Sequence, residues 1–192
     1  MRILGLSFGF HDAGACMLQD NTIEFAGHSE RYSKEKNDPW INHDLINAAI
    51  EKGLPDVIVL HEKAWAKRMR NLYAGNWRAL REPTQRQWIK KFYPQLAGIP
   101  IKDYWHHETH AGAGALSSEF DECAVMVIDA IGEFDCASIW QWKDNNLKKI
   151  HSVKFPSSLG LFYSAVTHHV GLKPMEDEYI LMGMAAYGKE EN

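Results

Sequence analysis

A chain of 192 residues, of which 45% are hydrophobic, can bury a full core, so disorder is not the default expectation. The formal net charge of -4 provides no global attraction for nucleic acid or for an anionic membrane. Cys16, Cys123 and Cys136 lack CxxC spacing and fit a reducing compartment. The N-terminal run resembles neither a signal peptide nor a spanning helix, so we expect a cytoplasmic protein without membrane contact.

The first elements form a predicted antiparallel meander. Residues 2–8 and 13–19 are short apolar runs, and residues 22–28 alternate between apolar and polar side chains. Asp20 and Asn21 supply turn chemistry between the last two runs. Three strands in sequence, joined by tight bends, are therefore expected at the start of the chain.

Helices and strands then alternate. Apolar residues at helical spacing predict a helix from Ile41 to Lys52, which ends before Gly53. The remaining predicted elements of this half are a strand over 57–61, one or two helices over 63–93 with a break near Glu82-Pro83, a short strand over 99–105, and a helix over about 106–117.

The pattern restarts after Phe120. Predicted strands over 124–132, 136–142 and 147–155 are followed by a helix over about 158–170, a polar turn over 171–177 and a short run to Gly188. A repeated β-β-β-α-β-α unit indicates an α/β fold of the duplicated actin-like ATPase (ribonuclease H-like) class. We expect a first subdomain over 1–120, complete, and a second over 121–192 that is truncated.

Two histidines and one aspartate form a candidate metal site. His106 and His110 lie four residues apart, so a helix would present both imidazoles on one face. Asp129 ends a predicted apolar strand, where a carboxylate is costly without a partner. Two histidines and a carboxylate can make a facial site for Fe(II) or Zn(II). The alternatives are surface or capping histidines and an aspartate that caps the following bend.

The bends after the first strand of each repeat carry further candidates. His11, followed by Asp12, could take a proton from a hydroxyl near neutral pH, or it could be an ordinary turn residue. Gly9 in the first bend and Gly132-Glu133 in the second could let a phosphate approach backbone N–H groups. Isolated glycines are common, so the phosphate-binding hypothesis depends on their equivalent places in the two repeats.

Residues 63–91 hold nine Lys or Arg against a single acid, Glu82, with Trp65, Trp77 and Trp88 between them. Basic residues between aromatic ones could bind a phosphate backbone. A run of this kind more often forms the solvated face of a helical hairpin whose tryptophans pack inward. We therefore do not expect a nucleic-acid partner.

The motifs together resemble one family, the O-carbamoyltransferases of antibiotic biosynthesis and nodulation-factor decoration, with their phage and bacterial relatives. The resemblance covers nearly the whole chain, and its segments are LGLSFGFHDAGACML (4–18), SERYSKEKNDP (29–39), HHETHAGAGAL (106–116), VIDAIGEFDCASIW (127–140), SLGLFYSAVTHHVGLK (158–173) and EYILMGMAAYG (178–188). The combination is specific, whereas no single segment is.

The resemblance implies a two-step reaction. A C-terminal domain makes carbamoyl adenylate from carbamoyl phosphate and ATP, and the actin-like domain passes the carbamoyl group to a hydroxyl of a sugar-like or related small acceptor. It implies that His106, His110 and Asp129 bind iron or another divalent metal and that His11, beside Asp12, is the general base. Glu178 falls in a segment assigned to substrate, where Ile180 replaces the usual lysine and leaves the anion contact of that lysine in question.

We therefore interpret the chain as a partial carbamoyltransferase, because the resemblance places another metal aspartate, the adenosine-binding half and the adenylate-forming domain beyond residue 192. A longer chain or a second chain would supply these parts. One alternative is a relative of the tRNA threonylcarbamoyl-transfer proteins, although segments 29–39 and 158–165 favour the small-molecule branch. Others are a non-catalytic nucleic-acid or partner-binding module that uses residues 63–91 and a degenerate remnant.

Overall fold

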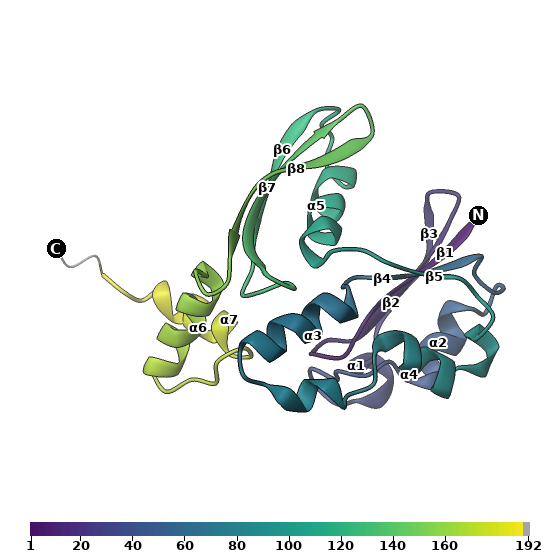
Figure 1. Ribbon diagram of the computed structural model, residues 1–192, viewed down its shortest axis with the longest axis horizontal. Helices are drawn as coiled ribbons and strands as arrows, with labels where there is room; N and C mark the ends of the chain where they lie inside the picture. The colour runs from purple at the N-terminus through teal and green to yellow at the C-terminus, as the bar shows by residue number, and fades with distance from the viewer. Residues whose placement is uncertain (190–192) are drawn as a thin grey trace. The chain divides into compact units, whose positions relative to one another are not determined.

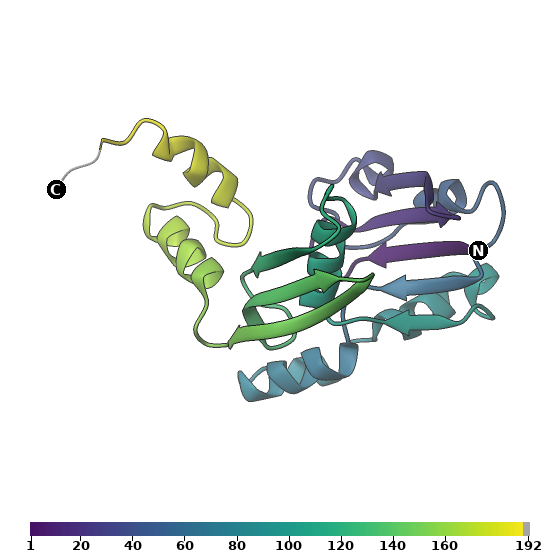
Figure 2. The same cartoon turned by 90° about the horizontal axis from the view of Figure 1, so that it is seen from above.

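The computed structural model describes residues 1–189, and the chain divides after His106 into two compact units. The first unit contains a five-stranded sheet in the order β3-β2-β1-β4-β5 (Figure 2). Its strands are β1 (Arg2–Ser7), β2 (Gly14–Gln19), β3 (Thr22–His28), β4 (Val57–Leu60) and β5 (Ile101–Asp103). β1, β2 and β3 pair antiparallel, whereas β1, β4 and β5 are parallel. The predicted α/β, actin-like arrangement of this half is confirmed.

The predicted Asp-Asn turn closes the β2–β3 hairpin. Asp20 and Asn21 have φ values of 47° and 69°, and Gln19 pairs with Thr22 on either side of them. Aspartate and asparagine tolerate this left-handed backbone better than most residues do, and it matches the twist of paired strands. The local sequence therefore sets the hairpin register.

The helices of the first unit are α1 (Glu30–Ser33), α2 (His43–Ala49), α3 (Ala64–Tyr73) and α4 (Gln85–Phe92), with 3-10 turns η1 (Trp77–Leu80) and η2 (Pro94–Leu96). α2 and α4 lie on the same side of the five-stranded sheet (Figure 1). The predicted break in 63–93 is confirmed. Thr84 begins α4 with a capping box, in which its hydroxyl accepts from the Gln87 N–H and the Gln87 side chain accepts from the Thr84 N–H.

The core of the first unit lies between this sheet and its helices. Alternate residues of β1 and β4 are fully buried, as period-two side chains facing one core must be. They pack with apolar residues of β2, α2, α4 and η2, and the cluster includes Leu4, Leu6, Met17, Leu45, Ile46, Ile58, Leu60, Ile89, Tyr93 and Leu96. The Tyr93 hydroxyl donates to the carbonyl of Ile41 at 2.6 Å. Burial raises the pKa of Tyr93 to about 12.

The second unit contains the repeated meander. β6 (Cys123–Ile128), β7 (Asp135–Lys143) and β8 (Asn146–Lys154) form an antiparallel sheet in that order. Helix α5 (His106–Leu116) packs on it through Ala111, Val127 and Trp140. Residues 107–192 form one compact unit, which includes nearly all of α5. The subdomain boundary that we expect at residue 120 stays a prediction.

Two helices follow the second sheet. α6 (Leu159–His169) begins at Ser158, whose hydroxyl accepts from the Leu161 N–H at 3.0 Å. α7 (Glu178–Ala185) occupies the run that the sequence pattern left without an element. Its apolar residues do not gather on one face, so helical periodicity gave no signal there.

Among residues 1–189, none of the helices combines the length and the apolar content that crossing a bilayer requires.

Candidate functional site

Helix α5 brings together the two predicted histidine ligands. His106 is its first residue and is half-buried, whereas His110, one turn later, is 52% exposed at its side chain. The spacing of four residues places both imidazoles on one face of the helix. The segment after His110 is rich in Ala and Gly and continues the helix to Leu116. The two histidines are therefore neighbours on α5 because of their spacing along the chain.

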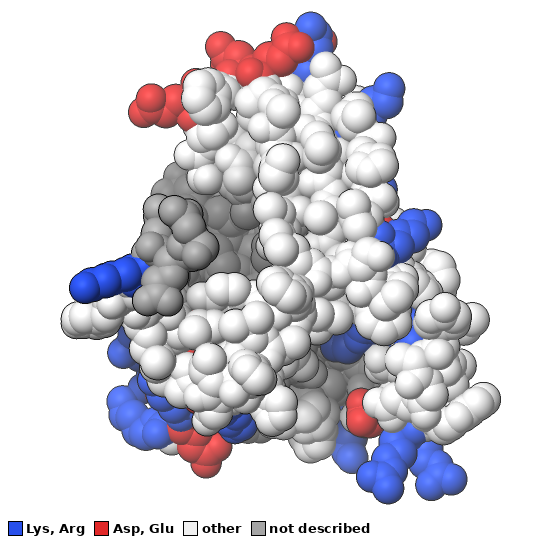
Figure 3. Space-filling model, turned by 90° about the vertical axis from the view of Figure 1, so that its left-hand side faces the viewer, with Lys and Arg blue, Asp and Glu red and all other residues white. Residues whose placement is uncertain are grey.

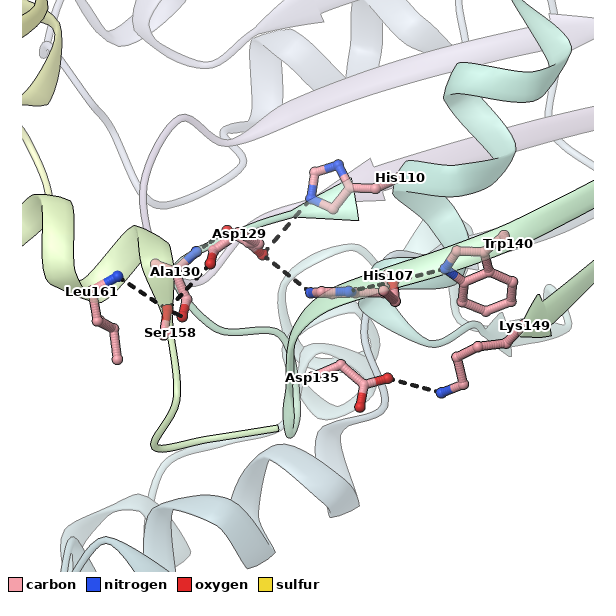
Figure 4. A network of polar contacts seen from close by, with 10 residues as sticks. His107, His110, Asp129, Ala130, Asp135, Trp140, Lys149, Ser158 and Leu161 are labelled. Atoms are coloured by element: carbon pink, nitrogen blue, oxygen red, sulfur yellow. Dashed lines mark hydrogen bonds and ion pairs between the residues drawn. The ribbon is translucent and has the colours of Figure 1, made fainter. Parts of the chain in front are cut away.

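Asp129 enters the same site from the end of β6. Its backbone N–H donates to the Cys136 carbonyl at 2.9 Å, and its Oδ1 accepts from the Ala130 N–H at 2.7 Å. The second carboxylate oxygen, Oδ2, lies 4.0 Å from Nε2 of His110 (Figure 4). Ligand atoms of His106, His110 and Asp129 all lie within 4.8 Å of one another.

This set of donors fits a divalent transition metal. Two neutral imidazole nitrogens and one carboxylate oxygen on a common face match the ligand types and the open positions of Fe(II) or Zn(II) sites. The backbone N–H groups of Asp129 and Ala130 both donate hydrogen bonds, and these bonds hold the carboxylate of Asp129 in position. The structure therefore places the three predicted ligands together.

A buried histidine beside the ligands was missed by sequence reasoning. His107 is 2% exposed, and its Nδ1 lies 2.8 Å from the Ser138 hydroxyl, which also accepts from the Trp140 Nε1–H at 2.7 Å. Its other ring nitrogen, Nε2, faces Oδ2 of Asp129 at 3.9 Å (Figure 4). The only sequence signal was a second histidine within HHETH, which predicts no partner by itself.

The loop that carries Asp129 is also held from α6. The Ser158 hydroxyl donates to the Ala130 carbonyl at 2.6 Å and lies 3.3 Å from that of Asp129. A Cβ at Gly160 would lie 2.6 Å from the Asp129 carbonyl oxygen and the Ala130 nitrogen. Only glycine permits this close approach of helix and loop. The start of α6 thus fixes the backbone of a candidate metal ligand.

A second histidine that sequence reasoning missed packs against His106. His61 follows β4, and the two ring centroids are 5.4 Å apart in an edge-on arrangement. Burial lowers the pKa of His61 to about 4, and the neighbouring His106 acts in the same direction. His61 is therefore uncharged near neutral pH and does not repel a cation held by its neighbour.

The other predicted catalytic residues lie in the first unit. His11 and Asp12 are adjacent on the loop after β1, and Nδ1 of His11 lies 2.8 Å from an Asp12 carboxylate oxygen. Both side chains are exposed, at 47% and 41%. Gly9, two residues earlier, has a φ of 94°, and its N–H donates to the Pro39 carbonyl at 2.7 Å.

Gly132 and Glu133 lie in the corresponding bend of the second unit. The Gly132 N–H donates to the Asp135 carbonyl at 2.9 Å, and Glu133 is 4% exposed. Glu178, at the first position of α7, accepts from the Ser164 hydroxyl at 2.5 Å and from the Met175 N–H at 2.7 Å. The carboxylate of Glu178 thus joins α6 to α7, and its predicted substrate role stays a prediction.

The basic stretch over 63–91 is partly neutralised within the first unit. Lys67 pairs with Glu62 at 2.8 Å, and Arg86 pairs with Asp103 at 2.7 Å. Trp88 stacks on Trp40 with ring centroids 4.1 Å apart, as expected for a tryptophan that packs inward. Trp65 and Trp77 remain 62% and 70% exposed. The prediction that the tryptophans pack inward holds for Trp88 and is wrong for Trp65 and Trp77, and ion pairs engage Lys67 and Arg86 of the nine basic residues.

A solved structure of the Ppx/GppA family member of Aquifex aeolicus aligns with the whole chain and with 64% of its own length. Its sequence identity is 13% and its TM-score is 0.36. Among the sequence relatives, the Synechocystis protein sll1178 is 34% identical over 97% of this chain and 35% of its own length. The Methanocaldococcus jannaschii protein MJ1051 is 27% identical over 99% of this chain and 34% of its own length.

The nodulation protein NolO of Bradyrhizobium diazoefficiens is 35% identical over 43% of this chain and 15% of its own length. This chain thus spans about a third of the length of the two relatives that match nearly all of it. A family described as "Carbamoyltransferase N-terminus" matches residues 2–192. The predicted resemblance is thereby confirmed, and the chain belongs to this carbamoyltransferase N-terminal family.

Proposed function

We propose that the chain is the front part of an enzyme that transfers a carbamoyl group from carbamoyl adenylate to a hydroxyl of a small acceptor. The adenylate would be made from carbamoyl phosphate and ATP by parts outside these 192 residues. One observation carries the proposal: in a member of this family, His106, His110 and Asp129 lie with ligand atoms within 4.8 Å of one another. Such a cluster at a strand end suits a bound metal rather than a structural role.

His11 is proposed as the general base. With Asp12 accepting a hydrogen bond from Nδ1–H, the imidazole would present its Nε2 lone pair to an incoming hydroxyl. As the acceptor oxygen bonds to the carbamoyl carbon, the bond from that carbon to the adenylate phosphate oxygen breaks and AMP leaves. The hydroxyl proton passes to Nε2 of His11. The exposure of His11 supports this role because an acceptor can reach it.

Fe(II), or another divalent metal, is the proposed cofactor, and when bound it supplies Lewis-acid polarisation of the carbamoyl oxygen. His106 and His110 would hold it with neutral nitrogens, and Asp129 would supply the one negative charge of this ligand set. His107 and Ser158 would keep Asp129 in place through the contacts described above. Metal binding of this kind requires all three ligand side chains.

The single phosphate group of the adenylate is proposed to contact a glycine-bearing bend, and Gly9 and Gly132-Glu133 are the candidates. Positive φ at Gly9 and the open space around its Cα favour close approach of a ligand. The N–H groups of Gly9 and Gly132 already donate to backbone carbonyls, so phosphate contact there would require those bonds to be exchanged or neighbouring donors to be used.

Further protein, in the same chain or in a second one, is proposed to cover α6 and α7. These helices contain a single Asp, Glu, Lys or Arg, namely Glu178, and they expose Leu159, Phe162, Tyr179 and Met182 by more than half. Charged side chains lie mainly around the edge of the face in Figure 3. Exposed apolar surface of this kind favours contact with another protein segment.

Two other functions are less well supported. A relative of the tRNA threonylcarbamoyl-transfer proteins would share the metal ligands, but segments 29–39 and 158–165 favour a small acceptor. A nucleic-acid module would use residues 63–91, and it predicts salt-dependent retention on RNA or DNA that is lost when Arg68, Arg70 and Arg78 are reversed. The ion pairs of Lys67 and Arg86 argue against that module.

Anaerobic Fe(II) calorimetry tests the proposal at its metal site. We expect one ion per wild-type chain and no saturable binding by His110→Ala. His151→Ala is the matched control, because His151 is an exposed histidine of the same unit outside the cluster, and it should bind like the wild type. Equal binding by wild type and His110→Ala would contradict the proposed ligand set.

A further inference from the structure

A stripe of large apolar side chains runs along the outside of helix α3 in the first unit. Trp65, Met69 and Tyr73 follow one another at intervals of four residues, which places them on one face of the helix. Each is exposed by more than half, whereas Ala66 is fully buried. α3 therefore packs on its unit through a small side chain and leaves its largest apolar side chains on the outside.

The 3-10 turn η1, which contacts α3, adds further exposed apolar side chains. Trp77 and Leu80 belong to η1, and both are exposed. Five large apolar side chains are thus exposed within residues 65–80. Exposed apolar side chains that gather in one segment of a folded protein mark a contact with another protein or with a membrane.

The stripe is held in a defined orientation at its first residue. The indole of Trp65 contacts that of Trp105 edge-on, with ring centroids 5.8 Å apart. The ammonium group of Lys63 lies over the Trp105 ring, 4.8 Å from its centroid. A side chain that is already ordered in the free protein loses little rotamer freedom when it meets a partner. Trp65 is thus suited to act as an anchor.

The charge around the stripe has one sign. Residues 63–81 contain six Lys or Arg and no Asp or Glu. Arg68 and Arg70 lie on the two sides of the stripe, by their positions on the helix. Arg78 and Arg81 are exposed on η1 and directly after it. The apolar side chains of α3 are therefore bordered by positive charge.

The partner that fits this surface is anionic. A second copy of the chain would bring like charges together, which opposes association. Proteins that bind single-stranded nucleic acid use a groove that follows the phosphate backbone, whereas this stripe is the outer face of one helix. An acidic protein would have to match the shape of that face. A bilayer adapts to it: Trp and Tyr favour the headgroup level, Met enters beside them, and Lys or Arg contact lipid phosphates.

We propose that α3 and η1 form a peripheral binding surface for an anionic bilayer, in which Trp65, Met69 and Tyr73 enter the headgroup region and the flanking arginines contact lipid phosphates. Such a surface requires no membrane-spanning segment, and its local positive charge counts for more than the net charge of -4, because salt screens charges farther than about 10 Å away. The net charge and the N-terminal run, from which we expect no membrane contact, do not describe a surface helix. None of the candidate metal ligands belongs to this surface, so binding to a bilayer requires no metal.

Vesicle sedimentation and tryptophan fluorescence test the proposal with the 192-residue chain. The anionic vesicles contain equal parts of phosphatidylcholine and phosphatidylglycerol, and the neutral vesicles contain phosphatidylcholine alone. We expect saturable binding to the anionic vesicles, with a shift of tryptophan emission to shorter wavelength, and binding to the neutral vesicles that is about 10-fold or more weaker. Raising the salt concentration should release the chain from the anionic vesicles.

Two double variants separate the apolar contribution from the charged one. Met69→Ser with Tyr73→Ser should weaken binding to the anionic vesicles by about 10-fold, because it removes apolar side chains that would enter the bilayer. Arg78→Gln with Arg81→Gln should weaken that binding by about 5-fold or more and reduce its dependence on salt. It should leave the weaker binding to neutral vesicles unchanged.

Matched controls come from exposed residues of the same unit outside residues 63–81. Ile23→Ser with Leu54→Ser is the apolar control, and Lys90→Gln with Lys102→Gln is the charge control. Both should bind the anionic vesicles like the wild type, and thermal melting should show that all four double variants fold.

Three results would overturn the bilayer surface. The first is a folded wild type that does not bind the anionic vesicles, and the second is equal binding to neutral and anionic vesicles. The third is full binding by a folded protein that carries Met69→Ser and Tyr73→Ser. Retention on single-stranded RNA without vesicle binding would replace the bilayer surface with the nucleic-acid module described above.

Discussion

Nε2 of His107 faces Oδ2 of Asp129 at 3.9 Å, while Nδ1 of the same ring lies 2.8 Å from the Ser138 hydroxyl. The Trp140 Nε1–H can only donate, so it uses one lone pair of Ser138, and the Ser138 hydroxyl can either donate to Nδ1 or accept from it. The Asp129 carboxylate that faces Nε2 favours the tautomer in which the serine donates to Nδ1. That tautomer puts N–H on Nε2 and directs its positive end at the carboxylate. The distance to Asp129 is too long for a direct hydrogen bond, so the attraction is electrostatic.

Ser138→Ala should therefore weaken metal binding, although Ser138 is not one of the three candidate metal ligands. Without the hydroxyl, His107 can change tautomer. The partial positive charge of its Nε2–H would then no longer face the Asp129 carboxylate. Outer-shell partners of metal ligands typically contribute about 10-fold to 100-fold in affinity, and we expect a loss in that range by Fe(II) calorimetry. Ser152→Ala, on the directly paired position of β8, is the control and should retain full affinity.

Gly160→Ala should displace the loop that holds Asp129. The added Cβ would lie 2.6 Å from backbone atoms of Asp129 and Ala130, and backbone cannot yield as a flexible side chain can. We expect a loss of about 1–3 kcal/mol in the free energy of unfolding, with weaker Fe(II) binding. Gly183→Ala in α7 meets nothing within 4 Å and should instead be neutral or stabilising by about 0.5–1 kcal/mol. Equal effects of the two substitutions in denaturant titrations would contradict this account.

Tyr93 gives the stability of the chain a dependence on alkaline pH. Its pKa is about 12 in the folded protein and about 10 in an unfolded chain. Its contribution is therefore fully present below pH 10 and is lost as the pH rises toward 12, because the unfolded chain ionises first. Tyr93→Phe should lose about 1–3 kcal/mol at pH 8, since the Ile41 carbonyl loses its donor. The difference between wild type and variant should shrink from pH 10 upward in denaturant titrations.

Thr84→Ala should destabilise α4 from its first turn. The substitution removes the hydroxyl that accepts from the Gln87 N–H, and a lost N-cap of this kind typically costs about 1 kcal/mol. Thr84→Ser keeps the hydroxyl and should be close to wild type. A Thr84→Ser protein as unstable as Thr84→Ala would show that the cap is not the cause.

The sequence alone determined most of the local elements, although not α7, and the pairing of the two ligand histidines. Alternation and apolar runs placed the strands, Asp20-Asn21 placed the turn of the first hairpin, and spacing of four residues put His106 and His110 on one helical face. These features depend on neighbours along the chain, so periodicity and turn chemistry reveal them. Asp129 was a candidate ligand because a carboxylate at the end of an apolar strand is costly without a partner, and the family resemblance implied the same ligand set.

Only the tertiary structure decided which distant residues support the site. Ser138 and Trp140 on β7 form the hydrogen-bond network that holds His107. Gly160 is required because α6 packs directly against the loop that carries Asp129. The hydrogen bond from Gln85 Nε2 to the Phe8 carbonyl forms only once α4 packs beside the loop after β1. Such relations depend on burial and on contacts between segments far apart in the chain. The residue pattern of a single segment does not encode them, because the energy of a polar group is set by the partners that folding brings to it.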